Sequence, residues 1–195
     1  MKRRALLIGG GVLAVGAISG VWLLTRGAFE FPPDDKPEGA YLRIAHALTE
    51  GDPKVLFDYI EDPARDAIFT LHDFRKRSSD LVSANFPEPD RARLLAEYEK
   101  VASAPDGYAL FSTLADERGW IGRLRKDLSG IAEVQIEGER ATIVTARGTR
   151  YSFRKRGAGM WGLTMFTAEL VMDANRAARD FDVVRRAAED YAAGK

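Results

Sequence analysis

A run of 21 residues without a charged side chain, from Ala5 to Thr25, limits what the N-terminal end of this chain can form. As an α-helix it would span about 31 Å at ~1.5 Å per residue, close to the ~30 Å hydrocarbon core of a bilayer. Leu13 lies near its middle and Trp22 near its far end, where an indole ring favours the membrane–water interface. Because the bilayer interior offers the backbone no hydrogen-bonding partner, a helix is the expected form. The run therefore predicts a membrane anchor over residues 1–26.

Basic side chains flank this run unevenly. Three of them occupy positions 2–4, whereas only Arg26 follows closely. Because positive charge is retained on the cytoplasmic side, we expect a single-pass inner (plasma) membrane protein whose N-terminus is cytoplasmic. The domain that follows would be periplasmic or extracytoplasmic, and the lipid bilayer would be a partner through residues 5–25. A signal peptide cleaved near Ser19 is the alternative, but the apolar residues after it would make an unusual mature N-terminus.

The rest of the chain has the composition of an acidic globular domain without thiol chemistry. Residues 27–195 hold 25 of the 29 basic groups and all 29 acidic groups, a net charge of −4. An acidic domain lacks the positive surface that nucleic-acid binding needs, so we expect no nucleic-acid partner. The absence of cysteine excludes disulfides, thiolate metal sites and cysteine nucleophiles. We expect no cofactor and no metal.

Prolines and clustered charges over residues 27–38 predict a tether between the anchor and a domain over 39–195. In the first part of this domain, apolar residues recur at helical spacing and are interrupted by prolines and glycines. Asp52 and Asp62 each precede a proline, and we expect each aspartate to cap a helix that begins with that proline. The predicted helices cover about 41–50, 53–61, 63–85, 90–104, 108–118 and 120–128.

After Gly130 the apolar pattern changes from a period near 3.6 toward a period of 2, which indicates strands. Short turns separate four segments, and consecutive strands joined by short turns form an antiparallel meander. The last segment is apolar on both faces, so we expect it in the middle of the sheet. The predicted strands cover 131–137, 141–146, 149–156 and 160–168.

A further helix is predicted after the strands, because apolar residues there recur at steps of four and three. The stripe predicts packing against the chain's own sheet or helices, and a dimeric coiled coil is the open alternative. We therefore expect an α+β fold: an N-terminal transmembrane helix, then helices packed on a four-stranded antiparallel meander, with an additional C-terminal helix. The stripe comprises Leu170, Ala174, Ala177, Phe181, Val184, Ala188 and Tyr191.

The order of these elements resembles the NTF2-like (cystatin-like α+β) superfamily over residues 40–168. The similarity lies in the helix YLRIAHALTEGDPKVLFDYI, the long helix from ARDAIFTL, and strands ending RYSFRKRGAGMWGLTMF, where a Gly-x-Trp strand follows a turn. The resemblance implies helices packed on a sheet. Because that superfamily includes enzymes, ligand pockets and non-catalytic extracytoplasmic modules, it implies no single function.

Two motifs are candidates for chemistry. Residues 157–162 fit the GxGxxG pattern of dinucleotide sites, but a strand rather than a helix follows them, so we interpret them as a hairpin turn. His46 and Glu50 lie four residues apart on a predicted helix, which is a spacing that lets a carboxylate orient a catalytic imidazole. A surface helix pair is the alternative interpretation.

Basic residues cluster on the third predicted strand, where Arg150, Arg154 and Arg156 form a candidate basic patch. The patch would suit an acidic partner or anionic lipid headgroups, and a solvated sheet face is the alternative. With no convergent catalytic set, the sequence predicts a membrane-anchored non-catalytic binding or assembly module whose protein partner or small ligand is unknown. The alternative function is a small cofactor-free hydrolase or isomerase with an NTF2-like pocket, which requires an acid–base pair in a closed cavity.

Overall fold

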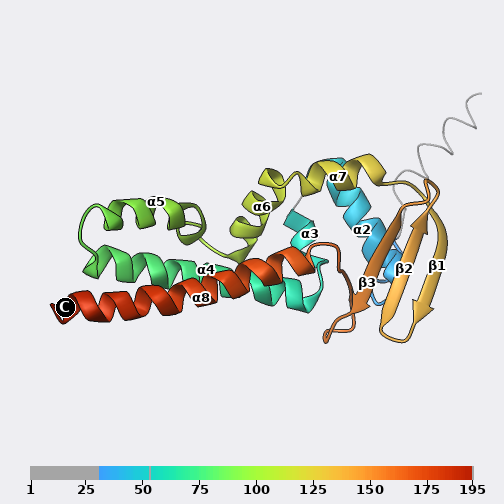
Figure 1. Ribbon diagram of the computed structural model, residues 1–195. Helices are drawn as coiled ribbons and strands as arrows, with labels where there is room; N and C mark the ends of the chain where they lie inside the picture. Colours follow the sequence, from blue (N-terminus) through green and yellow to red (C-terminus); the bar gives the residue numbers. More distant parts are fainter. Residues whose placement is uncertain (1–30, 53, 195) are drawn as a thin grey trace, which may run out of the picture. The chain divides into compact units, whose positions relative to one another are not determined.

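The computed structural model describes residues 31–52 and 54–194 (Figure 1). The architecture is α+β, as predicted. The helices are α2 (Pro37–Glu50), α3 (Lys54–Asp58), α4 (Asp62–Asn85), α5 (Asp90–Ala102), α6 (Gly107–Glu117), α7 (Trp120–Asp127) and α8 (Thr167–Ala192). The strands are β1 (Ile131–Glu137), β2 (Arg140–Thr145), β3 (Arg150–Lys155) and β4 (Trp161–Leu163).

In this part of the chain, no helix combines the length and the apolar character that a bilayer crossing requires. The predicted anchor, with Ala5, Leu13, Trp22 and Thr25, lies outside the described residues.

The sheet has the strand order β1-β2-β3-β4 with antiparallel neighbours, which confirms the predicted meander. Its inner face packs against α2, where the ring centroids of Tyr41 and Tyr151 are 5.5 Å apart. Its outer face carries mostly polar side chains, and no helix of the described residues covers it (Figure 1). The outer-face residues of β1 to β3 are Glu133, Gln135, Glu137, Arg140, Thr142, Val144, Arg150, Ser152 and Arg154.

The last strand differs from its prediction in length and position. The sequence predicts a strand over 160–168 in the middle of the sheet, but only Trp161–Leu163 pair with β3, and β4 is the last strand of the order. The chain leaves the sheet because Phe166 turns into the core, where its ring stacks on Trp120 at 4.3 Å, and α8 begins at Thr167. The turn before β4 is a hairpin closed by Arg156, as predicted for the glycine-rich motif.

A backbone junction joins β4 to the start of α4. Ile60 forms a parallel bridge with Leu163, the Leu163 N–H donates to the Tyr59 carbonyl at 2.7 Å, and the Glu61 N–H donates to the Leu163 carbonyl at 3.1 Å. Gly162 makes this approach feasible: a Cβ atom there would lie 2.6 Å from the Glu61 Cα. A strand glycine at such a position marks a close approach of another backbone.

The two longest helices, α4 and α8, run parallel and side by side (Figure 1). The alanine-rich stripe of α8 is buried against α4, as predicted, except that Tyr191 at its end is 39% exposed. Phe74 and Phe181 meet with ring centroids 5.3 Å apart, and Arg75 pairs with Asp180 at 2.7 Å. These contacts set the register of the two helices.

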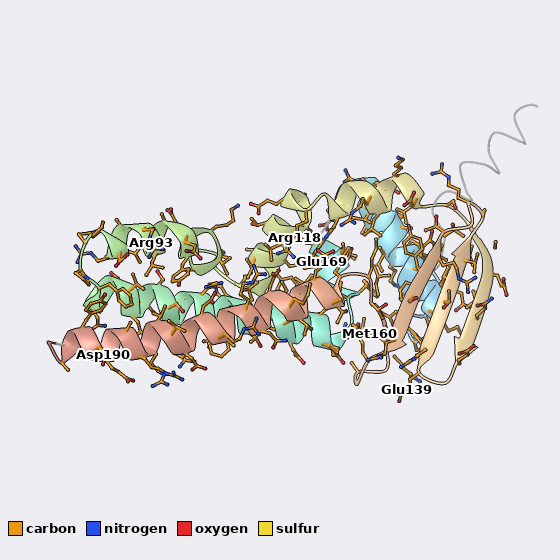
Figure 2. The ribbon with its side chains drawn as sticks, in the orientation of Figure 1. Arg93, Arg118, Glu139, Met160, Glu169 and Asp190 are labelled. Carbon is orange, nitrogen blue, oxygen red and sulfur yellow. The ribbon has the colours of Figure 1, made fainter. Side chains whose placement is uncertain are left out.

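Arg118, the residue that follows α6, connects α6 to the first turns of α8. Figure 2 shows Arg118 beside Glu169. A guanidinium nitrogen of Arg118 lies 3.7 Å from a carboxylate oxygen of Glu169. The same guanidinium also binds Asp173 and lies over the Trp120 ring.

Buried apolar residues form two separate clusters. The main core joins α2, α3, α4, α6, α7, the inner face of the sheet and the first half of α8, and it contains Phe57 and Trp120, both 0% exposed. The second cluster lies farther along the helices, between α4, α5 and α8. Its fully buried members are Val82, Phe86, Tyr98, Val184 and Ala188.

Two local details differ from the sequence predictions. The sequence predicts Asp62 as the cap of α4, but Glu61 is the cap residue and Asp62 is the first residue of the helix. Residues 34 and 35, assigned to the tether, hydrogen-bond to the domain: the Asp34 carboxylate accepts from Tyr59, and the Asp35 carbonyl accepts from the Trp161 indole.

Replacement of Gly162 with alanine should destabilise the fold. The added Cβ must displace the backbone at Glu61, and overpacking of this kind costs about 1–3 kcal/mol. Gly122→Ala is the matched control, because a Cβ there meets nothing within 4 Å and alanine is the better helix former. Chemical denaturation should show a lower free energy of unfolding for G162A only. Equal stability of the two variants would contradict the claim that the backbone junction requires a glycine at position 162.

Truncation of Phe57 should remove much of the stability of the main core. Its ring is fully buried and contacts Tyr108 and Phe111 at centroid distances of 4.4 and 5.3 Å. Phe57→Ala should lower the free energy of unfolding by about 3–5 kcal/mol. Met172→Ala, at a side chain that is 63% exposed, should change it by less than about 0.5 kcal/mol in the same denaturation experiment.

Candidate functional site

Two consecutive acidic residues at the start of α4 face two arginines at the end of β3. Glu61 is 4% exposed, and its Oε1 accepts a hydrogen bond from the Thr167 hydroxyl. Its Oε2 lies 3.7 Å from Arg154 Nε and has no hydrogen-bond donor among the described residues. The Arg154 side chain is 46% exposed, so the pair joins a buried carboxylate to a cation that reaches solvent.

Asp62 and Arg156 form the second pair, and it is better satisfied. Arg156 Nε donates to Asp62 Oδ1 at 2.6 Å, and the Gly157 N–H donates to Asp62 Oδ2 at 3.1 Å. Arg156 also donates to the Asp58 carbonyl at 2.6 Å, and its side chain is only 11% exposed. This pair fixes the β3–β4 turn against the beginning of α4.

The charge of Arg156 controls the ionisation of Asp62. Partial burial alone would raise the pKa of the Asp62 carboxyl, but the hydrogen bonds from Arg156 and Gly157 and the positive charges of Arg156 and Arg65 outweigh it. The net effect is a pKa below the ordinary value of 3.8.

A pocket opens on the outer face of the sheet beside Glu61, and we call it the Glu61 pocket. Its volume is about 370 Å³. Two carboxylates, two guanidinium groups and three hydroxyls line it, together with Ala141 and Phe153. The charged and hydroxyl residues are Glu61, Glu137, Arg140, Arg154, Thr142, Ser152 and Thr164.

The register of the sheet brings these groups together from distant positions in the sequence. Arg140 pairs with both Glu137 and Arg154 across β1, β2 and β3, so these three side chains share one face. The Thr164 hydroxyl and N–H both donate to the Ser152 carbonyl, at 3.2 and 3.0 Å, which holds the chain after β4 at the edge of the pocket. The arrangement offers hydrogen-bond acceptors and cationic donors to one small ligand.

His46 and Glu50, the predicted acid–base candidates, both lie on the exposed side of α2. Neither residue lines any of the four pockets described in this section. Their setting is thus that of a helix surface, which was the alternative interpretation of this pair.

The three arginines of the predicted basic patch have different partners. Arg150 donates to the Gln135 side chain at 2.9 Å, Arg154 faces Glu61, and Arg156 is largely buried on Asp62. The structure therefore brings Arg154 into the Glu61 pocket and directs Arg156 to the domain's own acidic residue.

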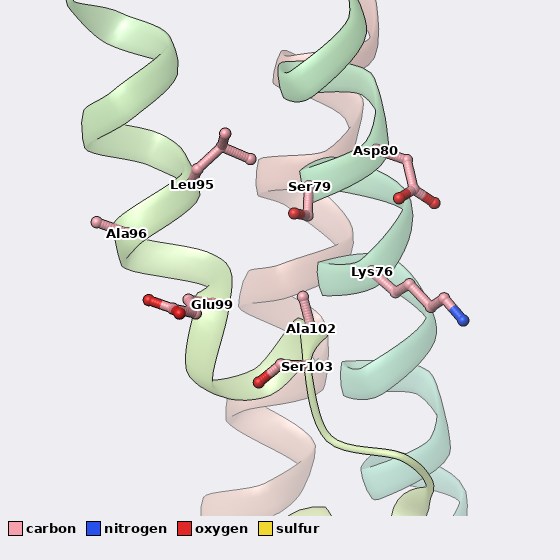
Figure 3. Close-up of a pocket in the computed structure, with 8 residues that line it drawn as sticks. All are labelled: Lys76, Ser79, Asp80, Leu95, Ala96, Glu99, Ala102 and Ser103. Carbon is pink, nitrogen blue, oxygen red and sulfur yellow. The ribbon is translucent and has the colours of Figure 1, made fainter.

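Other pockets lie on the surface of the part of the chain that the structure describes. One of about 500 Å³ lies between α4 and α5, where Leu95 points toward Ser79 while Lys76 and Asp80 point away from α5 (Figure 3). Another, of about 320 Å³, lies between α5 and α8 beside Val183, which is 67% exposed.

The fourth pocket, of about 170 Å³, lies between α7 and the start of β3. It is lined in part by Tyr151, whose buried hydroxyl has no hydrogen-bond partner among the described residues. Burial, together with nearby Tyr41 and Asp127, raises the pKa of Tyr151 to about 12, so the phenol stays protonated.

Sequence reasoning did not identify Glu61 as a site residue. The only local signal is an acidic side chain directly after the apolar residues Tyr59 and Ile60, ahead of the Asp-Pro helix start. Its burial depends on Gly162, about a hundred positions later, and no periodicity in the sequence links the two.

Comparison of the chain with protein-family models, with curated proteins and with solved structures found no match. Within the described residues, no three His, Asp or Glu side chains gather in a way that could hold a metal ion. The function is therefore argued from the geometry of the domain.

The Asp62–Arg156 pair should make the stability of the domain depend on pH. Because the pKa of Asp62 is lowered in the folded state, the pair stabilises the fold above pH 3.8 and loses this effect as the pH falls through the folded-state value. The stability difference between the wild type and Asp62→Asn should therefore shrink below pH 3.8, as measured by denaturation at each pH.

A carboxyl NMR titration provides the direct readout. Arg156→Met should move the Asp62 midpoint upward toward 3.8, whereas Arg186→Met, at an exposed position on α8, should leave it unchanged. An unchanged midpoint in R156M would contradict the assignment of the pKa shift to Arg156.

Proposed function

We propose that this chain is a membrane-anchored, non-catalytic binding or assembly module. The uncharged run over residues 5–25 would hold it in the inner membrane, with the domain periplasmic or extracytoplasmic. The outer face of the sheet would be the surface on which it binds a partner or ligand.

The observation that carries this proposal is the contrast between the two faces of the sheet. The inner face of β2 and β3 is closed by the helices, with Tyr41, Ile44, Tyr151 and Phe153 all at most 4% exposed. The outer face is uncovered in the described structure and holds the Glu61 pocket with its buried carboxylate. Packed apolar side chains thus occupy the space where an enclosed pocket would lie, which favours recognition at the surface over the hydrolase or isomerase alternative.

The NTF2-like assignment is also a proposal. The order of helices followed by a four-stranded meander supports it. The long α8, which packs on α4 after the last strand, is an addition to the usual ending of that superfamily.

Single-cysteine labelling tests both the location and the binding surface, because the chain has no cysteine of its own. Ser152→Cys places a thiol on the outer face, and Asn175→Cys places one on an exposed position of α8 as the control. In intact cells with a permeabilised outer layer, a membrane-impermeant maleimide should label N175C. S152C should react several-fold more slowly there than in the purified full chain, because its bound partner shields it.

The possible results separate the parts of this proposal. Labelling of N175C only after cell lysis would overturn the extracytoplasmic location. Equal labelling rates of S152C in membranes and in the purified protein would overturn the outer face as the binding surface. The rate for N175C should be the same in both preparations.

A further inference from the structure

The Glu61 pocket contains a buried acceptor that the protein itself leaves without a donor. Glu61 Oε2 is fully buried, and its nearest cation, Arg154 Nε, stands 3.7 Å away, beyond hydrogen-bonding distance. Buried polar atoms almost always have a partner, and a carboxylate oxygen without one is costly. A donor supplied by a ligand would satisfy this atom.

Arg154 lies where a movement of its side chain would expose Glu61 Oε2 to a ligand. Its side chain is 46% exposed and makes no other ion pair among the described residues, so it can turn toward solvent when a ligand cation takes its place beside the buried carboxylate. Glu61 itself is held by the Thr167 hydroxyl and by the backbone junction at Gly162, so it would stay in place. The pocket therefore combines a fixed anion with a cation that can move.

The charges that line the pocket are balanced. Two carboxylates, Glu61 and Glu137, and two guanidinium groups, Arg140 and Arg154, all face it. A ligand of a single charge would meet repulsion from one half of this set, whereas a ligand that carries both charges would not. The volume of about 370 Å³ lies at the lower end of the ~300–1,000 Å³ range of small-molecule sites.

We propose that the Glu61 pocket binds a small zwitterion in which a primary ammonium group lies beside an anionic oxygen group. The ammonium donates to Glu61 Oε2, and the anionic group binds the guanidinium groups of Arg154 and Arg140. The chemistry is that of a free α-amino acid or of a phosphoethanolamine headgroup. This inference deepens the proposed function and depends on the outer face being a binding surface.

Calorimetric titration of the purified full chain in a non-phospholipid detergent tests the proposal. L-Alanine and O-phosphoethanolamine are the two probes, and binding of one, the other or both supports the site and identifies the anionic group. Phosphocholine keeps both charges but has no N–H donor. Its affinity should therefore be lower than that of phosphoethanolamine by about tenfold or more, as expected for loss of a charge-assisted hydrogen bond. Ethanolamine and acetate, each with a single charge, should also bind more weakly.

Substitutions on the same sheet face provide matched controls. Glu61→Gln and Arg154→Gln should each weaken binding of the zwitterion about tenfold or more. Glu133→Gln and Arg150→Gln alter the same residue types on the same face but outside the pocket lining, so they should leave the affinity unchanged. Thermal unfolding of each variant establishes that it is folded, and R154Q, at a half-exposed side chain, decides the test if E61Q does not fold.

Three results would overturn the proposal: no heat of binding for either zwitterion, equal affinity for phosphocholine, or unchanged affinity in R154Q. These results are distinguishable from failure of the proposed function. The cysteine-labelling experiment reports location and shielding in the membrane, whereas the titration reports ligand chemistry in the purified chain, so either can fail alone.

Discussion

The contact between the Gly162 and Glu61 backbones is the constraint on which the arrangement of this domain depends. It is the place where the sheet, whose strands pair only with sequence neighbours, is tied to the α3–α4 segment. Without a side chain at position 162, residues 59–61 can add themselves to the edge of β4 as a further extended segment. The same contact fixes where α4 begins, and α8 then takes its register from α4 through Phe74 and Arg75. The absence of a Cβ atom at position 162 thus sets the positions of both α4 and α8.

The polar site follows from this junction. Because Glu61 and Asp62 stand at its end, their carboxylates meet Arg154 and Arg156 of the neighbouring strand and turn. Each carboxylate oxygen of Asp62 accepts a hydrogen bond, whereas one carboxylate oxygen of Glu61 has no donor among the described residues. A buried carboxylate with an incomplete set of hydrogen bonds is costly to stability, so its presence in a folded domain calls for an explanation. The two adjacent acids therefore differ: Asp62 is satisfied within the fold, and Glu61 is the residue that we propose for recognition.

Local patterns in the sequence predicted the features that depend on neighbouring residues, such as helix boundaries and the buried side of a helix. Proline and glycine predicted the break before α6, and the spacing of Leu170 to Ala188 predicted the buried side of α8. The sequence did not predict that β4 stops after Leu163, because this depends on Phe166 packing against Trp120. It did not predict that Glu61 is buried either, because this depends on contacts with Gly162 and Leu163, about a hundred positions later. Asp62 has the local signature of a helix cap but is the first residue inside α4, and its carboxylate binds Arg156 and the Gly157 N–H instead. Sequence spacing did not predict which distant charged residues pair in the fold.

The division of the buried apolar residues into two clusters has a consequence for how the domain comes apart. The cluster of Val82, Phe86, Tyr98, Val184 and Ala188 shares no member with the main core, and the α4–α5 connection and the C-terminal turn of α8 surround it. Separate apolar clusters can open independently, so we expect this end of the helices to open as a unit of its own. Fraying there would expose the chain to proteolytic nicking between α4 and α5 while the sheet, the Gly162 contact and the pocket beside it remain folded.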